Sequence, residues 1–157
     1  MNQNVSIRKA DLFNHDDRKD LLILLESYKA DPMGGGAPYS EEEERRLIKG
    51  LSMHPKCEVY FCYIEGEFAG GAVCFETFAT FSALPCVNIH DICVLPDFRG
   101  KGIGGKLLDA VIEAAKTKGA GKVTLEVRED NPVAQGLYRK KGFAPSDPEM
   151  FFWTHKF

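Results

Sequence analysis

The chain has 157 residues, of which 44% are hydrophobic and 27% charged, and its formal net charge at pH 7 is −3. A chain of this size and balance forms one globular domain with its own core, here residues 1–157. The slight negative charge and the lack of a dense basic stripe exclude general nucleic-acid binding. The N-terminal residues are polar and no apolar run approaches about 18 residues, so we expect a cytoplasmic protein with no membrane partner.

The five cysteines are odd in number and show no C-x-x-C spacing. Most of them lie inside apolar runs, which predicts buried thiols in a reducing compartment and no disulfide framework. The acidic run at 41–44 follows a Ser at position 40, and Glu43 completes a capping box with it. These acidic residues therefore indicate the start of a helix, whose dipole they suit, and we predict no metal site.

The first half of the chain predicts a strand, two helices and a hairpin, in that order. The strand covers residues 5–8, and a helix with one apolar face covers about 15–29. A Gly- and Pro-rich connection at 31–38 leads to the helix that Ser40 caps. Two runs rich in aromatic and β-branched residues, 58–64 and 67–81, form a hairpin across Glu65-Gly66.

The second half alternates strands and helices. Strands are predicted over residues 86–95, 122–127 and 150–157, and helices over about 103–117 and 131–140. Asn131-Pro132 supplies an N-cap followed by proline at the first helical position. The whole order predicts an α/β fold with a mixed, mostly antiparallel sheet and one parallel crossover between 86–95 and 122–127.

A glycine-rich segment, Pro96-Asp97-Phe98-Arg99-Gly100-Lys101-Gly102-Ile103-Gly104-Gly105-Lys106-Leu107, joins that strand to the next helix. Glycines let the backbone approach a ligand closely, and the N–H groups of a helix's first turn attract anions. The segment therefore predicts a site for a phosphate-bearing cofactor.

Three phosphate-binding motifs overlap in this segment. Gly100-x-Gly102-x-x-Gly105 fits a dinucleotide fingerprint, but residues 96–99 separate it from its strand and too few βα units follow. Gly100-x-x-x-x-Gly105-Lys106 fits a P-loop, but Leu107 stands where Ser or Thr should bind Mg²⁺. Arg99-x-x-Gly102-x-Gly104 resembles the acyl-CoA pyrophosphate loop of the GNAT family, the Gcn5-related N-acetyltransferases. Only this third interpretation gives Arg99 a role, and only for it does the sequence downstream of the motif also match the family.

The resemblance to GNAT enzymes covers nearly the whole chain in element order and is sharpest from His90 to Phe143. The segments His90–Pro96 and Leu137–Gly142 look most like the diamine or polyamine enzymes and the yeast-type histone/polyamine branch. The resemblance implies a GNAT fold: six to seven strands, splayed between the fourth and fifth, flanked by four helices. It also implies acetyl-CoA as the donor, an amine as the acceptor, and direct transfer in a ternary complex.

Family resemblance also assigns roles to individual residues. The cofactor would be bound by Ile92, Cys93, Val94, Arg99, Gly100, Lys101, Gly102, Ile103, Gly104, Gly105, Asn131, Ala134 and Tyr138. Tyr138 would act as the general acid that protonates the leaving thiolate. On the residues alone, Tyr138 could equally be a packed helix residue, and Asn131 is a helix cap in either interpretation.

The acceptor side is less well defined by the sequence. His90 stands where the diamine enzymes have a glutamate; it could serve as the base or be a structural residue of the sheet. By strand alternation Asp91 is expected to face the opposite side from His90. We predict acceptor contacts from Tyr28, Asp31, Met33, Glu76, His90 and Glu126, with 31–36 forming either a lid or a plain surface loop.

These observations predict an N-acetyltransferase that acts on a primary amine of a small molecule, such as a polyamine, an amino-acid-like metabolite or an antibiotic. Two alternatives remain open: a non-catalytic acyl-CoA sensor on the same fold, and an enzyme for lysine or N-terminal amines of proteins. By analogy with related folds, we expect a homodimer.

Overall fold

The computed structural model describes residues 4–157. Its elements, in order, are β1 (Val5–Lys9), α1 (His15–Ala30), α2 (Glu41–Met53), β2 (Cys57–Ile64), β3 (Glu67–Ala79), β4 (Leu84–Val94), a short 3₁₀ turn (Pro96–Phe98), α3 (Ile103–Thr117), β5 (Lys122–Leu125) and α4 (Pro132–Lys140). No helix among these residues is long and apolar enough to cross a membrane.

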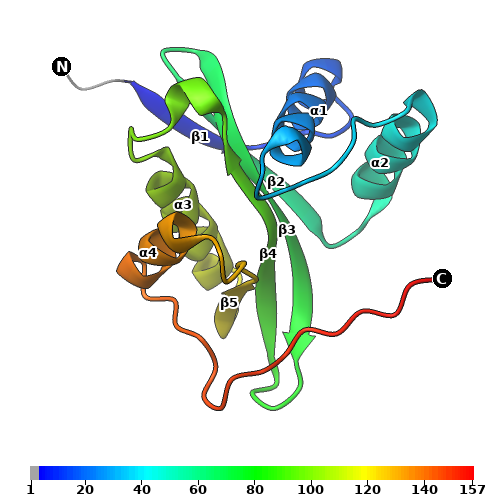
Figure 1. The fold of residues 1–157 in the computed structure, drawn as a ribbon. Coiled ribbons are helices and arrows are strands. Elements are labelled where there is room, and N and C mark those ends of the chain that lie inside the picture. Colours follow the sequence, from blue (N-terminus) through cyan, green and yellow to red (C-terminus); the bar gives the residue numbers. More distant parts are fainter. Residues whose placement is uncertain (1–3) are drawn as a thin grey trace.

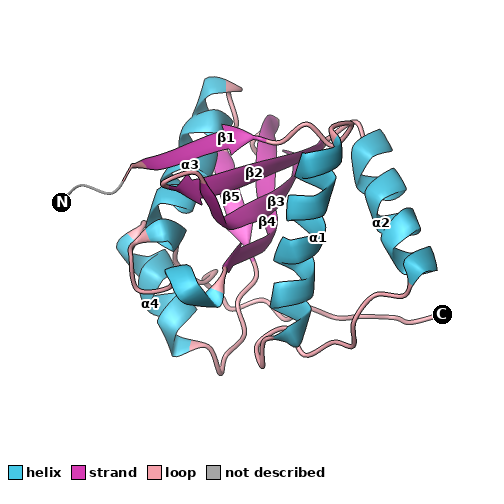
Figure 2. Ribbon diagram, turned by 90° about the horizontal axis from the view of Figure 1, so that it is seen from above, coloured by secondary structure: helices cyan, strands magenta, loops and turns pink. Residues whose placement is uncertain are grey.

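The strands form a single sheet in the order β1-β2-β3-β4-β5 (Figure 1). Neighbours are antiparallel, except that β4 and β5 run parallel. The helices lie in two layers, with α1 and α2 over one face and α3 and α4 over the other (Figure 2). This is the predicted α/β architecture with its single parallel crossover.

Two predictions about the sheet are wrong. The described sheet has five strands, not six or seven, and residues 150–157 form no strand. The aromatic composition of 150–157 suits a strand, but a strand also needs a neighbour to pair with. In the described structure this segment has none.

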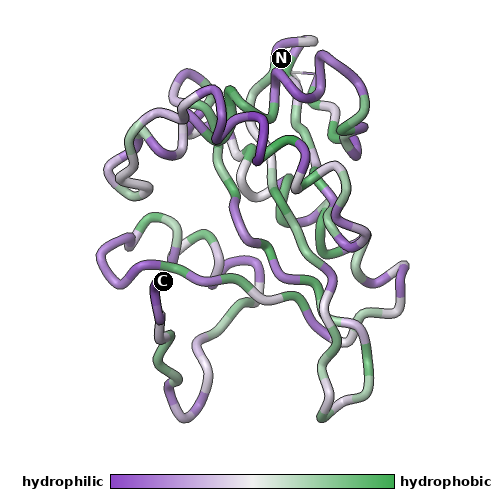
Figure 3. Tube along the Cα trace, turned by 90° about the vertical axis from the view of Figure 1, so that its right-hand side faces the viewer, coloured by the Kyte–Doolittle hydropathy of each residue, from purple (hydrophilic) through white to green (hydrophobic). Residues whose placement is uncertain are grey.

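The core consists of two apolar layers, one on each face of the sheet. Leu21, Leu24 and Leu25 of α1 pack against Val59 and Phe61 on the first face. On the second face, α3 packs against buried residues of β3 and β4: Leu108 and Val111 contact the cluster that contains Ala72, Cys74 and Ile89. Hydrophobic stretches accordingly follow the central strands (Figure 3). All five cysteines are unpaired thiols, as predicted.

Side chains cap three helices where the sequence places polar residues. Ser40 and Glu43 form the predicted capping box of α2, and the Asn131 side chain accepts from the Ala134 N–H at the start of α4. Asn14 accepts from the first N–H groups of α1 in the same way. These caps satisfy N–H groups that have no partner within the helix, so they fix where each helix begins.

Asp17 anchors α1 to the edge of the sheet and is the only buried charged residue in the described chain. Arg8 of β1 binds both of its carboxylate oxygens, at 2.8 and 2.6 Å, and the Asp11 N–H donates to it at 2.7 Å. Arg8 and the Asp11 N–H lower the pKa of Asp17. A bidentate pair of this kind is among the stronger side-chain contacts, so it fixes β1 against α1.

A β-bulge in β4 determines which way its polar residues face. Val73 of β3 lies opposite Asp91, and the next residue, Cys74, lies opposite Ile89, so His90 is the extra residue. The His90 ring packs edge-on against Phe75, which joins the core layer of α1. Asp91 lies opposite Val73, which belongs to the same core layer as Tyr28. The expectation that Asp91 faces away from His90 is therefore wrong, because the bulge interrupts the alternation of the strand.

Candidate active site

A cavity of about 800 Å³ opens where β4 and β5 part. The two strands pair only as far as Ile89 and Leu125, where β5 ends. β4 continues to Val94, so the edge of Ile92–Val94 that points toward β5 has no strand partner in the described chain. Backbone groups left this way need another partner, and an amide-bearing ligand arm can provide one.

The glycine segment forms one end of this cavity. Gly100 and Gly102 adopt left-handed conformations, with φ of 74° and 77°, which a residue with a side chain enters only at a cost. α3 begins directly after Gly102, and no side chain caps it. Its first N–H groups are therefore available to an anion at the positive end of the helix dipole. These features fit the diphosphate of coenzyme A.

α4 forms the opposite wall and lies close to α3. A Cβ placed on Gly104 would lie 2.9 Å from Leu137 Cδ2, so glycine lets the two helices approach at this point. Pro132, Val133 and Leu137 line the cavity beside the capping residue Asn131. The close approach places the glycine segment and Tyr138 on the walls of the same cavity.

Tyr138 lies on α4 with its ring edge-on to Phe143, at a centroid distance of 6.1 Å. It lines the cavity. Burial raises its pKa, and the nearby Tyr28 hydroxyl adds a smaller effect in the same direction. The phenol is therefore protonated at neutral pH and can donate its proton.

The half-buried acid Asp91 lies near two tyrosines, Tyr28 and Tyr39, of which Tyr28 lines the cavity. Burial raises the pKa of Asp91, and the neighbouring His90 opposes this shift. Burial also raises the pKa of Tyr28 and of Tyr39, with Asp91 adding to both. Glu26 lies close by and accepts from the Tyr39 N–H at 2.7 Å. The group is negative, and it has hydroxyls that can bind an amine.

Arg99 connects the glycine segment to the connection between α1 and α2. Its Nη2 lies 2.9 Å from Asp31 Oδ2, and its Nε donates to the Val94 carbonyl at 3.0 Å. The Asp31 carboxylate also accepts from the Met33 N–H at 2.8 Å, which lowers the pKa of Asp31 together with Arg99. Asp31 and Met33 are thereby fixed at the rim of the cavity.

Most of the residues predicted for the site come together around this cavity. It is lined by Tyr28, Asp31, Met33, Ile92, Cys93, Val94, Arg99, Gly100, Gly102, Ile103, Gly104, Gly105, Asn131, Ala134 and Tyr138. The structure places four others outside the lining. The Lys101 ammonium donates to the Asp97 carbonyl, and Glu76 pairs with Lys56. His90 is exposed beside Phe75, and Glu126 accepts from the Asn88 amide.

Several lining residues were not predicted from the sequence. Phe98, Asp130, Pro132, Val133, Gly136, Leu137 and Lys140 line the same cavity. Val133, Gly136, Leu137 and Lys140 follow the three- and four-residue spacing of one helix face, which includes Ala134 of the predicted set. That spacing could have been used to predict these lining residues from the sequence. Asp91 does not line the cavity, and its orientation had no local signal because it depends on the bulge.

Three comparisons relate this chain to known proteins. An uncharacterized N-acetyltransferase of Archaeoglobus fulgidus is 31% identical over 136 residues, covering 85% of this chain and 89% of that protein. N-alpha-acetyltransferase 30 of Schizosaccharomyces pombe is 26% identical over 132 residues, covering 83% and 80%. The fold matches an aminoglycoside N-acetyltransferase solved in complex with CoA, with a TM-score of 0.78, 17% identity, and coverage of 99% and 97%.

The profile of the acetyltransferase (GNAT) family matches residues 21–143, which include both core layers, the glycine segment and Tyr138. The predicted resemblance is thus confirmed at the level of the family and of an acyltransferase. The chain belongs to the acetyltransferase (GNAT) family.

Proposed function

We propose that this N-acetyltransferase transfers the acetyl group of acetyl-CoA directly to a primary amine of a small molecule. One observation carries the proposal. A single cavity runs from an uncapped helix N-terminus, past the unpaired edge of β4, to a protonated tyrosine. That order of features corresponds to the order of a diphosphate, an amide-bearing arm and a thioester.

The chain's own residues would bind and orient the donor. The first N–H groups of α3 would bind the diphosphate, and the edge of Ile92–Val94 would pair with the amides of the pantetheine arm. Acetyl-CoA, when bound, supplies the thioester whose acetyl group is transferred. A backbone N–H at this edge would stabilise the negative charge that develops on the thioester oxygen.

Tyr138 is proposed as the general acid. A thiolate leaving group needs a proton or a strong hydrogen bond, and burial keeps the Tyr138 phenol protonated. Tyr138 sits on the α4 wall of the cavity, opposite the edge of β4. Its O–H would donate to the sulfur as the bond to the acetyl carbon breaks.

The acceptor must lose a proton before it attacks. For an alkylamine with a pKa of about 10.4, the neutral form at pH 7 lies roughly 4.6 kcal/mol uphill. Asp91 is half-buried and its raised pKa makes it a stronger base than an ordinary carboxylate. It would attract the ammonium group and take its proton, which is the carboxylate role that His90 cannot fill.

Direct transfer is favoured over a covalent enzyme intermediate. Cys93 is the only cysteine that lines the cavity in the described chain. Burial raises the pKa of its thiol, so it is a poor nucleophile at neutral pH. A ternary complex of enzyme, donor and amine therefore accounts best for the reaction.

A second acceptor class is the α-amine at the N-terminus of a protein, because the relative from Schizosaccharomyces pombe is named an N-alpha-acetyltransferase. An α-amine has a pKa of about 7.7–8.0 and needs little help to lose its proton near pH 7. The half-buried acid at Asp91 would give a larger advantage to a more basic alkylamine. This difference supports the small-molecule acceptor as the first choice.

The proposal is tested by screening amines with acetyl-CoA while following thiol release. The panel contains alkyl diamines, aminoglycosides, peptides with a free N-terminus, and N-terminally blocked peptides with an internal lysine. We expect kcat/KM for the best small amine to exceed that of every peptide by about tenfold or more. Turnover of peptides alone would show that the acceptor is a peptide or protein amine and not a small molecule. Binding of acetyl-CoA with no turnover of any amine would favour a non-catalytic sensor.

A further inference from the structure

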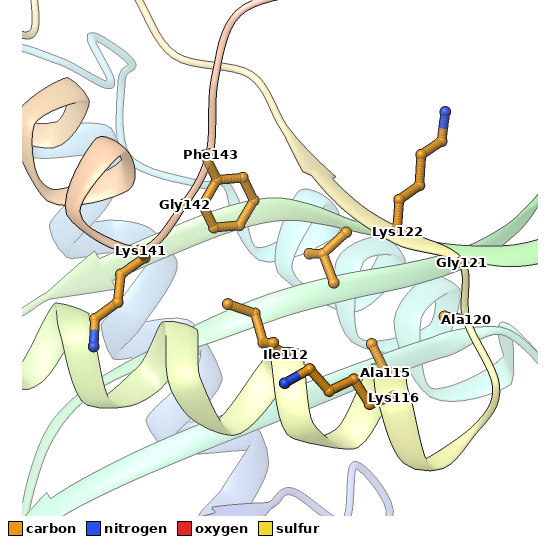
Figure 4. Close-up of a pocket in the computed structure, with 10 residues that line it drawn as sticks. Ile112, Ala115, Lys116, Ala120, Gly121, Lys122, Lys141, Gly142 and Phe143 are labelled. Atoms are coloured by element: carbon orange, nitrogen blue, oxygen red, sulfur yellow. The ribbon is translucent and has the colours of Figure 1, made fainter.

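Lys141 is the capping residue at the end of α4, and its side chain reaches α3. Its Nζ donates to both carboxylate oxygens of Asp109, at 2.8 and 2.6 Å. Figure 4 shows the Lys141 side chain extending from the end of α4 toward α3. The ion pair therefore joins two helices that form walls of the candidate active site, although neither Lys141 nor Asp109 lines the cavity itself.

α3 is the firmly anchored partner in this contact. Ile103, Leu107, Leu108 and Val111 are each at most 1% exposed. They belong to two apolar clusters that also include buried residues of the central strands. A helix held by this much buried surface keeps its place when one surface contact is lost.

α4 is anchored much less firmly. All nine of its residues are described, and none of them is buried. Leu137 and Tyr138 pack against the core layer of α3 only as partly buried side chains. Just beyond the end of the helix, Phe143 and Ile112 line a cavity of about 230 Å³, so the packing against α3 is incomplete there (Figure 4). Polar contacts must therefore help to fix the end of α4.

The pair of Asp109 and Lys141 is the contact best placed to do this. Among the described residues, no other ion pair joins α4 or its capping residue to another element. The stem of Lys141 also lies over the first turn of α3: a Cβ placed on Gly105 would lie 3.2 Å from Lys141 Cε. Lys141 is thus fixed to α3 by its stem and by its charge.

Tyr138 lies one turn before Lys141 and is tied to it through the backbone. The Tyr138 carbonyl accepts from the Lys141 N–H and from the Phe143 N–H, each at 3.0 Å. The Tyr138 ring also lies edge-on to the ring of Phe143. A shift of Lys141 relative to α3 therefore moves the phenol as well.

We propose that Asp109 and Lys141 are positioning residues that hold the Tyr138 hydroxyl at the reacting sulfur. This inference rests on the proposed function, in which Tyr138 is the general acid. Proton transfer needs the two heavy atoms within about 2.6–3.2 Å, so a displaced α4 is inactive even when the donor is bound. An ion pair that is partly exposed favours the aligned position by a factor of about five at most.

Lys141→Met tests the ammonium alone, because methionine keeps an unbranched apolar stem over Gly105. With saturating acetyl-CoA and the best amine of the panel, we expect kcat to fall by about two- to fivefold. The affinity for CoA, measured by calorimetry, should stay nearly unchanged, because α3 keeps its place. Asp109→Asn should lower kcat by a similar factor from the other side of the pair. Lys141→Arg keeps the charge and should restore most of the rate.

Lys116→Met is the matched control. Lys116 also forms an ion pair on α3, with Glu113 at 2.7 Å, but that pair does not reach α4. Its kcat should equal that of the wild type. Circular dichroism and thermal unfolding verify that every variant is folded at the assay temperature.

The decisive comparison repeats Lys141→Met in the Tyr138→Phe background. A residue that acts through the Tyr138 hydroxyl has no further effect once this hydroxyl is gone, so kcat should not fall again. A general loosening of the fold would instead lower kcat by the same factor in both backgrounds.

Two results would overturn this inference and leave the general acid in place. One is an equal loss of kcat in both backgrounds. The other is a wild-type kcat in Lys141→Met and Asp109→Asn when Tyr138→Phe is slow. A wild-type kcat in Tyr138→Phe would overturn the general-acid role and this inference together.

Discussion

Arg99 Nη2 and Asp31 Oδ2 lie 2.9 Å apart, and this ion pair joins the glycine-rich segment to the connection between α1 and α2. Both residues line the cavity. In the proposed function Arg99 belongs to the donor end, and Asp31 with Met33 to the acceptor end. Binding of a diphosphate would then compete with Asp31 for Arg99, so one charge would link the two ends of the site.

Asp31→Asn is expected to tighten CoA binding. The change removes a negative charge near the diphosphate and releases Arg99 from its partner. Ion pairs that are this exposed contribute at most about 1 kcal/mol, so the dissociation constant should fall by up to about fivefold. Calorimetric titration with CoA measures it. Arg99→Ala is the opposing variant and should weaken binding; equal affinity in all three proteins would show that Arg99 does not contact the donor.

Tyr138→Phe should lower kcat by about ten- to thousand-fold while leaving the affinity for CoA nearly unchanged. The variant removes only the hydroxyl that would protonate the leaving sulfur. Tyr63→Phe is the control, because the Tyr63 hydroxyl binds Asp20 and Arg8 away from the cavity. Steady-state rates with acetyl-CoA test the pair. An unchanged kcat in Tyr138→Phe would remove this residue from the general-acid role.

Asp91→Asn should reduce kcat/KM for the amine and change its pH dependence. Because burial raises the pKa of Asp91, the carboxylate is lost at a higher pH than an ordinary one. The wild-type rate should therefore fall as the pH drops through this raised pKa, and the fall should vanish in Asp91→Asn. A profile with the same acid limb in both proteins would contradict the role of base.

The same substitution should stabilise the fold near neutral pH. A carboxyl group whose pKa is raised on folding binds more protons in the native state, so its contribution to stability is favourable at low pH and is lost as the pH rises through the raised pKa. Replacing it with a neutral amide removes that loss. Thermal unfolding should give a higher Tm for Asp91→Asn at pH 7, with a smaller difference at pH 4. A lower Tm at both pH values would mean that the carboxylate has a stabilising partner.

Asp17→Asn should destabilise the protein by about 1.5–3 kcal/mol, because it weakens the charge-assisted hydrogen bonds between the Asp17 carboxylate and Arg8. The lowered pKa of Asp17 gives the pH dependence. Its stabilisation is fully present above the pKa of an aspartate in the unfolded chain, and it is lost as the pH falls toward the lower, folded-state pKa. Urea unfolding at pH 7 and pH 3 measures both. A difference between the variant and wild type that does not shrink at pH 3 would contradict this account.

Local signals in the sequence predicted much of the fold and of the donor end of the site. Ser40 with Glu43, and Asn131 with Pro132, fixed two helix starts because capping depends only on neighbouring residues. The glycine segment predicted the end of the cavity that fits the diphosphate, for a similar reason. Left-handed glycines before an uncapped helix are a local property of the chain.

Features that depend on distant residues could not be predicted in this way. The orientation of Asp91 follows from a bulge opposite Val73 and Cys74, and strand alternation gave the wrong face. The ion pair between Asp31 and Arg99 joins residues 68 positions apart. The strand expected at 150–157 had suitable residues. Whether it forms depends on a neighbouring strand to pair with, which the local sequence does not reveal.

The central claim is that the cavity between the end of β4 and α4 binds acetyl-CoA through the N-terminus of α3. Calorimetric titration of the purified protein with CoA tests it most directly. The comparison is Gly102→Val, a variant that forces a residue with a side chain into a left-handed backbone conformation in the glycine segment. We predict saturable one-site binding to the wild type and at least about tenfold weaker binding to the variant. Absence of binding to the wild type at millimolar CoA would contradict the claim.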